Sequence, residues 1–450
     1  MFGIATTPLE KWIREKARIG AELQGRSFLE ALQYYQLQRL NEVIEYARSN
    51  SPFYRHHFTS LQPASLTDLS DIRLFPFTTP SHLTLDPFRF LAVHQNDVAR
   101  IVTLHTSGST GETKRLFFTE TDLELTIDFF HHGMSTLVRP GQKVMIFLPG
   151  EKPDSVGDLL KRGLRRMDVH AFVYGPVTDP ANAAKSVADF GADSLVGIPT
   201  QVLGVARSFE GTEIERGSIK SVLLSTDYVS LAIVRSLEEI WGCRVFNHYG
   251  MTEMGLGGGV ECDALDGYHV READLYFEVV DHKTGKVCPD GTLGEVVFTT
   301  LTRKGMPLIR YRTGDIARII PQPCPCGSSL RRLARVKGRW DSLVHLGPDC
   351  TLTLPDMDEV LFRLTDLLDY HVTMSRGEDG IFKMLIDVYK KRGSILSKKD
   401  ILEAIENMEV IQKGVENGIL KKPIVRLKAN GSWSTTGVSK RNIRFVPDLD

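Results

Sequence analysis

The sequence predicts an α/β protein with a large N-terminal domain of mixed and parallel sheets with flanking helices, followed by a small α+β domain. Its 450 residues are too many for one hydrophobic core. Strand-like and helix-like segments alternate from about residue 98 to 300, and short strands between Gly/Pro turns after residue 276 indicate a β-rich subdomain. We expect one domain at residues 1–340 and a second at 341–450.

The first part of the chain, from about residue 9 to 48, is predicted to be helical. Apolar side chains recur there at intervals of three and four residues. The helix should end at Ser51, because the residue before a proline disfavours the α conformation and Pro52 follows.

The middle of the chain is predicted to form parallel strands joined by helices, because parallel neighbours need a crossover connection. The expected strands are 143–148, 169–174, 194–198, 221–224 and 244–246. The expected helices are 180–190, 200–209 and 230–241. Antiparallel strands are expected at 276–281, 295–300 and 315–320. The small domain should contain a strand at 381–389, a helix at 397–410 and a strand at 424–427.

Composition describes an ordinary globular protein rather than a nucleic-acid-binding or membrane-spanning one. The net charge is −1, with 42% hydrophobic and 25% charged residues. No run reaches the ~18 apolar residues of a membrane-spanning helix. The N-terminus lacks the apolar core of a signal peptide, and six cysteines in so long a chain do not indicate a disulfide scaffold. We expect a cytoplasmic protein.

A segment rich in hydroxyl groups and glycine follows the strand-like run 101–104. It reads Thr106, Ser107, Gly108, Ser109, Thr110, Gly111, Glu112, Thr113 and Lys114. Glycines permit close backbone approach to an anion, successive N–H groups form an anion-binding concavity, and the lysine adds a positive charge. The spacing differs from that of the common P-loop. The segment predicts a triphosphate-binding loop, with a polar surface turn as the alternative.

Three further motifs carry groups suited to a nucleotide. Residues 247–253 place an aromatic ring, a glycine and a carboxylate after a predicted strand, where they could stack on a purine and hold Mg²⁺. Residues 311–315 end a tight turn on a carboxylate, and residues 338–341 follow later in the chain.

The four motifs, in this order, resemble the adenylate-forming superfamily of acyl-CoA synthetases, peptide-synthetase adenylation domains and luciferases. The likeness runs over nearly the whole chain and is strongest to the phenylacetate–CoA ligase-like branch, above all at residues 303–315. Residues 47–55 and 71–80 are also similar to that branch.

This resemblance implies that the protein binds ATP and Mg²⁺. Tyr249 would lie against adenine, Thr252 would meet the phosphate and Glu253 would bind Mg²⁺. Asp315 would accept the ribose hydroxyls, and Arg339 would contact the nucleotide. The residues expected to bind ATP are Thr106, Ser107, Gly108, Ser109, Thr110, Gly111, Lys114, Ser225, Thr226, Asp227, Asn247, His248, Tyr249, Gly250, Thr252, Asp315 and Arg339.

The implied reaction joins a carboxylic acid, aryl or related, to AMP with loss of pyrophosphate and then transfers the acyl group to CoA. The protein would neutralise charge and align the reactants. The residues expected to act in catalysis are Lys114, Thr252, Glu253 and Lys440. The superfamily has a lysine directly after a glycine on a mobile small domain that turns at Asp341. Here two residues separate Gly437 from Lys440, so Lys421 and Lys422 stay as alternatives.

Two cysteines one residue apart, Cys324 and Cys326, predict a metal site. With Cys262 and His269 they would make a Cys₃His set, which is typical of structural zinc. The phenylacetate–CoA ligase-like branch has similar cysteines at both places. The alternative is a set of free buried cysteines and a core histidine. A zinc ion would brace the nucleotide pocket.

The chain departs from the branch at several places. Residues 161–166 are basic, which fits either a solvated helix face or an attraction for an acidic substrate. Residues 346–350 replace a segment that helps admit CoA. Three functions therefore stay open: a carboxylate–CoA ligase, an adenylate-forming enzyme with another acceptor, and a non-catalytic nucleotide-binding homologue. A homodimer is compatible with the sequence, which does not define the oligomeric state.

Overall fold

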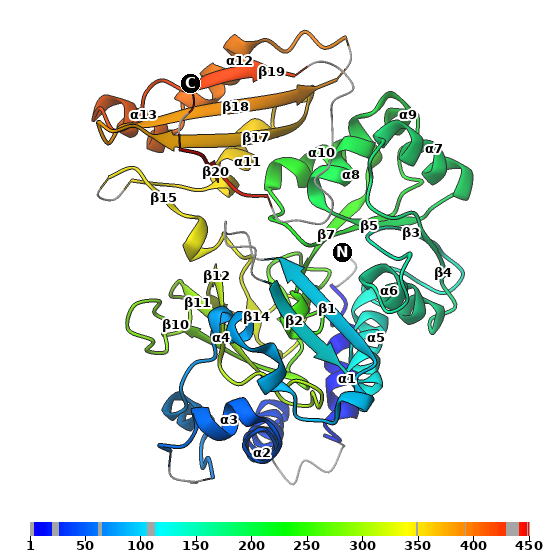
Figure 1. Cartoon of the computed structure of the whole chain (residues 1–450). Coiled ribbons are helices and arrows are strands. Elements are labelled where there is room, and N and C mark those ends of the chain that lie inside the picture. Colours follow the sequence, from blue (N-terminus) through cyan, green and yellow to red (C-terminus); the bar gives the residue numbers. More distant parts are fainter. Residues whose placement is uncertain are drawn as a thin grey trace. The chain divides into compact units, whose positions relative to one another are not determined.

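A computed structural model describes residues 4–19, 27–61, 65–105, 113–347, 350–391, 393–428, 441–447 and 449 (Figure 1). The chain forms two compact units, each assembled from separate segments. The first contains Met1–Arg139, Pro153–Met167 and Asn247–Val336, and the second contains Pro140–Lys152, Asp168–Phe246 and Lys337–Asp450. The C-terminal residues thus share a unit with most of the predicted parallel strands. The division at residues 340 and 341 stays a prediction.

Most α-helices of the first unit follow a residue whose side chain caps their first turn. They are α1 (Pro8–Lys16), α2 (Phe28–Asn50), α3 (Pro52–His57), α4 (Pro80–Leu85), α5 (Glu120–Met134) and α6 (Val156–Arg165), with short 3₁₀ turns η1 (Leu69–Leu74), η2 (Pro87–Phe90), η3 (Gln95–Asp97) and η4 (Thr252–Met254). Ser27 and Glu30 form a capping box at the start of α2. The predicted end of that helix before Pro52 is confirmed, and the proline begins α3, where its missing N–H is not needed.

Strands of the first unit are antiparallel, as predicted for the part after residue 276. β10 (Leu275–Val280), β11 (Gly294–Thr300) and β12 (Tyr311–Ala317) form a three-stranded sheet in that order. β13 (Ile319–Ile320), β14 (Arg332–Leu333), β9 (Tyr268–Val270) and β8 (Gly259–Glu261) lie side by side, and the end of β7 (Arg244–Tyr249) pairs with β8. β1 (Arg100–His105) and β2 (Thr113–Phe118) form a hairpin beside α5 (Figure 1). The predicted strand at 315–320 is therefore two strands, of which β12 starts earlier.

Parallel strands form the first part of the second unit, which confirms the prediction from the alternating pattern. β3 (Lys143–Phe147), β4 (His170–Val173), β5 (Ser194–Gly197) and β6 (Ser221–Leu224) lie in the order β6-β5-β3-β4. The connecting helices are α7 (Pro180–Phe190), α8 (Pro199–Arg207), α9 (Phe209–Thr212) and α10 (Leu231–Trp241). The helix expected at 200–209 is thus α8 and the start of α9.

The C-terminal part of the second unit is an α+β layer. It contains η5 (Trp340–Ser342), β15 (Val344–His345), β16 (Thr351–Leu352), α11 (Leu354–Leu361), β17 (Leu367–Arg376), β18 (Phe382–Lys390), α12 (Lys398–Glu406), α13 (Glu409–Glu416), β19 (Ile424–Leu427) and β20 (Arg444–Phe445). β18 and β19 are parallel and joined by helices, as predicted, although the single helix expected at 397–410 is two. β17, which pairs with β18, has no counterpart among the predicted elements.

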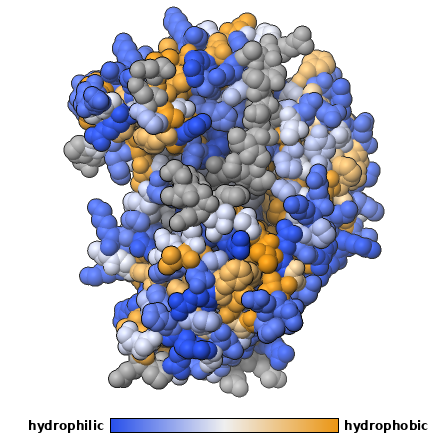
Figure 2. Space-filling view, viewed as in Figure 1, coloured by the Kyte–Doolittle hydropathy of each residue, from blue (hydrophilic) through white to orange (hydrophobic). Residues whose placement is uncertain are grey.

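Many buried apolar residues of the second unit form one core that includes both its parallel strands and its C-terminal layer. Many side chains on the face drawn in Figure 2 are hydrophilic, and hydrophobic ones are interspersed among them. In the part of the chain that the structure describes, no helix combines the length and apolarity that crossing a membrane requires.

The basic residues 161–166 lie in and just after α6. Arg162 pairs with Asp154, and Arg166 pairs with Glu124, each at 2.7 Å between exposed or partly exposed groups. This arrangement supports the interpretation as a solvated helix face.

Arg207 joins the two parts of the second unit. It is 2% exposed, and its guanidinium donates to the carbonyl oxygens of Phe362, Leu364 and Leu367, beyond the end of α11. We expect Arg207→Met to destabilise this unit by about 2–4 kcal/mol, because buried carbonyls lose their donors. Urea unfolding measures the change, and Arg216→Met, which removes an exposed side chain, is the control. Equal losses for the two variants would contradict the prediction.

Candidate nucleotide and metal sites

The first, second and third motifs meet at one ionic cluster in the first unit. Lys114, on β2, places its Nζ 2.5 Å from Oε1 of Glu253, on η4. The hydroxyl of Tyr311, at the start of β12, donates to the same carboxylate oxygen at 3.2 Å. Lys114 also lies 3.4 Å from the Tyr311 hydroxyl. A carboxylate, an ammonium and a phenol from three distant parts of the sequence therefore lie within hydrogen-bond distance of one another.

Glu253 is ionised although it is only 2% exposed. Burial favours the neutral form, but the charge of Lys114 and the hydrogen bonds from Lys114 and Tyr311 outweigh it, so that the pKa of Glu253 lies below its ordinary value. A buried anion of this kind is a suitable ligand for Mg²⁺.

A second aromatic–carboxylate pair lies further along β12. The hydroxyl of Tyr249 donates to Oδ2 of Asp315 at 2.8 Å. The ring of Tyr249 stacks on Tyr268, with centroids 5.7 Å apart and planes at 28°. Tyr311 and Asp315 are both buried positions of β12. The structure therefore gathers Lys114, Tyr249 and their carboxylate partners along one strand, while their predicted roles toward ATP stay predictions.

Other residues of the 247–253 motif are constrained by their surroundings. The N–H of Asn247 donates to Glu261 at 2.9 Å. A Cβ at Gly250 would lie 2.4 Å from the carbonyl oxygen of Leu256, so only glycine fits there. Burial lowers the pKa of His248 to about 4, which keeps its imidazole neutral at pH 7. Thr252 begins η4.

Several predicted site residues are not part of this cluster. Ser225, Thr226 and Asp227 follow β6 in the second unit. Arg339 donates to Asp341 at 3.1 Å in the same unit. Residues 106–111 and Lys440 lie outside the described residues. The nucleotide contacts expected of all these residues stay predictions.

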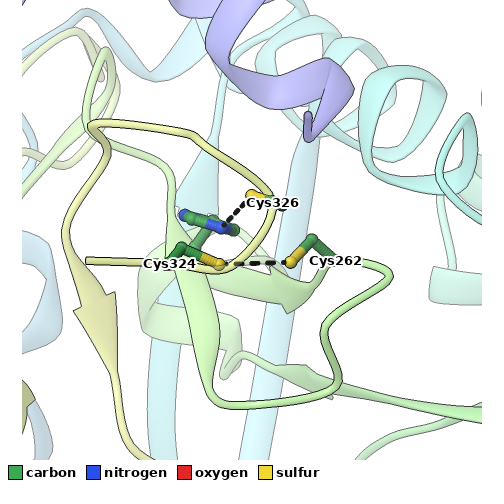
Figure 3. Close-up of side chains that lie close together, drawn as sticks. Cys262, Cys324 and Cys326 are labelled. Atoms are coloured by element: carbon green, nitrogen blue, oxygen red, sulfur yellow. Dashed lines mark hydrogen bonds between the residues drawn. The ribbon is translucent and has the colours of Figure 1, made fainter. Parts of the chain in front are cut away.

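The four predicted metal ligands converge in the first unit (Figure 3). Cys262 follows β8, His269 lies in β9, and Cys324 and Cys326 lie in the turn between β13 and β14. All four are buried, and their ligand atoms lie within 4.8 Å of one another. The sulfurs of Cys262 and Cys324 are 3.6 Å apart, too far for a disulfide bond, and Sγ of Cys326 is 3.4 Å from Nε2 of His269.

These distances fit a tetrahedral metal centre. With Zn–S near 2.3 Å and Zn–N near 2.1 Å, sulfur atoms should lie ~3.8 Å apart and sulfur and nitrogen ~3.6 Å apart. Burial raises the pKa of the Cys262 and Cys324 thiols. At Cys326 burial acts in the same direction, but hydrogen bonds from His269 and backbone N–H groups lower the pKa to about 6. The donor set is therefore chemically suited to zinc.

Two of the metal ligands are preceded in the sequence by residues that contact the nucleotide motif. Glu261, next to Cys262, accepts from the Asn247 N–H and from the guanidinium of Arg335 at 2.7 and 3.1 Å. Tyr268, next to His269, stacks on Tyr249. Metal binding at these strands would therefore hold the supports of the nucleotide motif in place.

Three further residues belong to the cluster around Glu253. Tyr311 begins the motif at residues 311–315, but its hydrogen bond to Glu253 cannot be inferred from the sequence. Arg303 donates to the backbone oxygens of Glu253 and Phe117. Arg303 also begins the stretch 303–315 that is similar to the phenylacetate–CoA ligase-like branch. That position could have indicated its role, because an arginine is rarely buried without partners. Asp122 supports the loop of Arg303 but resembles an ordinary helix-capping residue after Thr119 in the sequence.

We expect Asp315→Asn to weaken ATP binding about 10- to 100-fold, because an amide cannot replace a charged acceptor for both the Tyr249 hydroxyl and a ribose hydroxyl. Calorimetric titration with Mg·ATP measures the change. Asp281→Asn, in an exposed turn, is the control and should bind as the wild type does. An unchanged affinity of Asp315→Asn would remove the ribose role.

Comparison with known proteins agrees with the geometry. Residues 55–301, more than half of the chain, match a family model described as AMP-binding enzyme. The phenylacetate-coenzyme A ligase of Pseudomonas putida is 30% identical over 331 residues, covering 70% of this chain and 72% of the relative. That of Aromatoleum evansii is 32% identical over 327 residues, 70% and 71% of the two chains. That of Thermus thermophilus is 25% identical over 421 residues, 89% and 92% of the two chains.

A solved structure shares the fold at lower identity. The crystal structure of 2-hydroxyisobutyryl-CoA ligase in the postadenylation state in complex with 2-HIB-AMP has a TM-score of 0.76 and 21% identity, covering 92% of this chain and 89% of that one. A complex of the same ligase with R3-HIB-AMP has a TM-score of 0.75.

The chain belongs to the AMP-binding enzyme family. Within that family it is an adenylate-forming ligase of the phenylacetate–CoA ligase-like branch, which confirms the resemblance seen in the sequence.

Proposed function

We propose that this enzyme activates an aryl or related carboxylic acid with ATP and then transfers the acyl group to CoA. The observation that carries the proposal is the convergence of Lys114, Tyr249, Glu253 and Asp315 along β12. The similarity to phenylacetate-coenzyme A ligases supports the substrate class.

In the first half-reaction a carboxylate oxygen of the acid attacks the α-phosphorus of ATP, and the bond to pyrophosphate breaks. In the second, the thiol of CoA attacks the acyl carbon, loses its proton, and AMP leaves. Neither step requires a nucleophile from the protein, so charge neutralisation and alignment supply the catalysis. Glu253 would hold Mg²⁺, which offsets charge on the phosphates. Lys114 would contribute a positive charge next to it.

Acid-dependent exchange of labelled pyrophosphate into ATP tests the first step. The purified protein is assayed with a panel of aryl and aliphatic acids at saturating Mg·ATP. Exchange with an aryl acid is the expected result. Exchange with none of the acids would favour a non-catalytic nucleotide-binding homologue.

Addition of CoA to the same reaction tests the second step. Formation of an acyl thioester, detected by mass spectrometry, is expected. Pyrophosphate exchange without thioester would favour an adenylate-forming enzyme with another acceptor. Light scattering on the same preparation measures the oligomeric state, which the sequence leaves open and with which a homodimer is compatible. A cytoplasmic location stays a prediction.

We also infer that Cys262, His269, Cys324 and Cys326 hold a structural zinc ion. The distances between their ligand atoms and their complete burial support this assignment. A set of four protein ligands leaves no open position for substrate, so the ion would stabilise the fold rather than react.

A further inference from the structure

We propose that Arg303 is a positioning residue that fixes the magnesium-binding carboxylate of Glu253 relative to Lys114, with one buried water accepting from its Nε. The proposal rests on the proposed function, because it specifies how the protein holds the group that would bind Mg²⁺. The recorded hydrogen bonds of the Arg303 guanidinium go neither to the carboxylate nor to the ammonium, so it would act through the backbone of Glu253 and of Phe117 on β2, the strand that carries Lys114.

The contacts of Arg303 connect the two elements that carry the ion pair. Its side chain is buried, and one terminal nitrogen donates to the backbone oxygen of Glu253 at 2.8 Å. The other donates to the backbone oxygen of Phe117 at 3.1 Å, three residues after Lys114 on β2. The guanidinium lies 4.3 Å from the ring centroid of Phe118. Because a guanidinium is planar and rigid, it sets the spacing between η4 and β2.

The loop that carries Arg303 is itself held firmly. The buried carboxylate of Asp122 accepts the backbone N–H groups of Lys304 at 2.8 Å and Gly305 at 2.9 Å. A Cβ at Gly305 would lie 2.7 Å from Oδ2 of Asp122, so this close approach requires glycine. A fixed loop is needed if Arg303 is to position other groups rather than follow them.

A small cavity next to Arg303 can hold a partner for its Nε donor. Nε of Arg303 is buried and has no hydrogen-bond partner among the described residues. Arg303 lines a cavity of about 20 Å³, together with Thr126, Thr302, Asp274 and Arg271. A cavity of ~10–15 Å³ accommodates one water, and the polar walls offer it partners. A water here would accept from Nε and donate to an oxygen of the opposite wall.

Arg271 provides a matched control, because it lines the same cavity and is equally buried. Its guanidinium donates to Asp274 at 2.7 Å and to the backbone oxygen of Leu125. None of its recorded hydrogen bonds goes to Glu253 or to β2. Loss of Arg271 should therefore destabilise the fold without disturbing the ion pair.

The test compares Arg303→Met, Arg303→Lys and Arg271→Met in the pyrophosphate-exchange assay at varied Mg²⁺. We expect Arg303→Met to raise the Mg²⁺ concentration for half-maximal rate about tenfold or more and to lower kcat, since misplacement of a catalytic group by about 1 Å costs ~10²-fold. Arg303→Lys should recover part of the loss, because a lysine can reach one carbonyl but not both. Wild-type Mg²⁺ dependence in Arg303→Met, or an equal shift in Arg271→Met, would overturn the proposal.

A second measurement does not depend on activity. In protein labelled with ¹⁵N-lysine, the Lys114 ammonium signal is assigned with Lys114→Arg, and its chemical shift is compared between variants at one pH. Arg303→Met and Arg303→Lys should shift it, whereas Arg271→Met should not. If the wild type shows no exchange but Lys114 responds as expected, the proposed function fails and the positioning role stands. Unchanged Lys114 signals in both Arg303 variants would refute the positioning role.

A crystal structure at high resolution tests whether a water is bound next to Arg303. Electron density within hydrogen-bond distance of Nε of Arg303 is expected. An empty cavity, or a protein acceptor on Nε, would refute this part of the proposal.

Discussion

Glu253→Gln is expected to lower the rate of acid-dependent pyrophosphate exchange by about 10²–10³-fold, the loss typical of removing one preorganised electrostatic group from an active site. Glutamine has nearly the same shape as glutamate and can still accept from Tyr311. It lacks the charge that would hold Mg²⁺ and that pairs with Lys114. Steady-state exchange at varied Mg²⁺ measures the effect, and we expect that high Mg²⁺ does not restore the rate.

A control variant separates the loss of a buried charge from the loss of the magnesium ligand. Glu278 is as buried as Glu253 and is paired with Arg310 at 2.8 Å, outside the cluster. Glu278→Gln should lose stability and keep its Mg²⁺ dependence. If both variants lost exchange to the same degree, the assignment of Glu253 as a magnesium ligand would fail.

The double variant Glu253→Gln, Lys114→Met distinguishes the two tasks of the carboxylate. Glutamine alone leaves the ammonium of Lys114 partly buried without its counter-charge, so part of any stability loss belongs to Lys114. Removing both charges should recover that stability without recovering exchange. Recovered exchange would mean that Glu253 serves only to neutralise Lys114.

Removal of the metal from the Cys₃His site is expected to lower thermal stability and ATP affinity together. At a free metal concentration a thousand times Kd, a bound ion adds about 4 kcal/mol to the free energy of unfolding. This corresponds to roughly 10 °C in Tm for a unit of this size. ATP affinity should fall in parallel, because Glu261 and Tyr268 lie next to ligands and contact Asn247 and Tyr249. Metal analysis, calorimetry and Mg·ATP titration before and after chelation measure the three quantities.

Two cysteine variants complete this test. Cys324→Ser should lose the ion and reproduce the effects of chelation. Cys288→Ser, at a half-buried cysteine outside the cluster, is the control and should keep metal, Tm and affinity. Protein purified without chelators that contains no zinc, or Cys324→Ser with wild-type Tm, would exclude a structural metal.

Local patterns predicted much of the fold because they depend on neighbouring residues. The parallel strands β3 to β6 are short apolar runs between turn signals, and helices α7 and α10 begin at Asp179 and Ser230, which are favourable capping residues. The strand β17 was missed although polar and apolar residues alternate from Asp369 to Ser375, a pattern typical of a strand with one buried face. The break between α12 and α13 was also not predicted, because the helical spacing of apolar residues continues across it.

The nucleotide motifs and the cysteine pairs were readable because each is a compact run of chemically distinctive residues. The positioning groups were not. Arg303 and Asp122 form hydrogen bonds to backbone atoms of residues far away in the chain. Because nearly every residue has the same backbone groups, the sequence does not show which ones are the partners.

By itself the sequence determined the family and the alternating architecture. It also identified Lys114, Tyr249, Glu253 and Asp315 as candidate residues of the nucleotide site. Only the tertiary structure decided that Glu253 pairs with Lys114 and Tyr311, that Tyr249 pairs with Asp315, and that four metal-ligating side chains enclose one point. The physical reason is that residue type and spacing act locally. Hydrogen-bond distance, charge pairing and burial depend on which distant segments the packing of sheets and helices brings into contact.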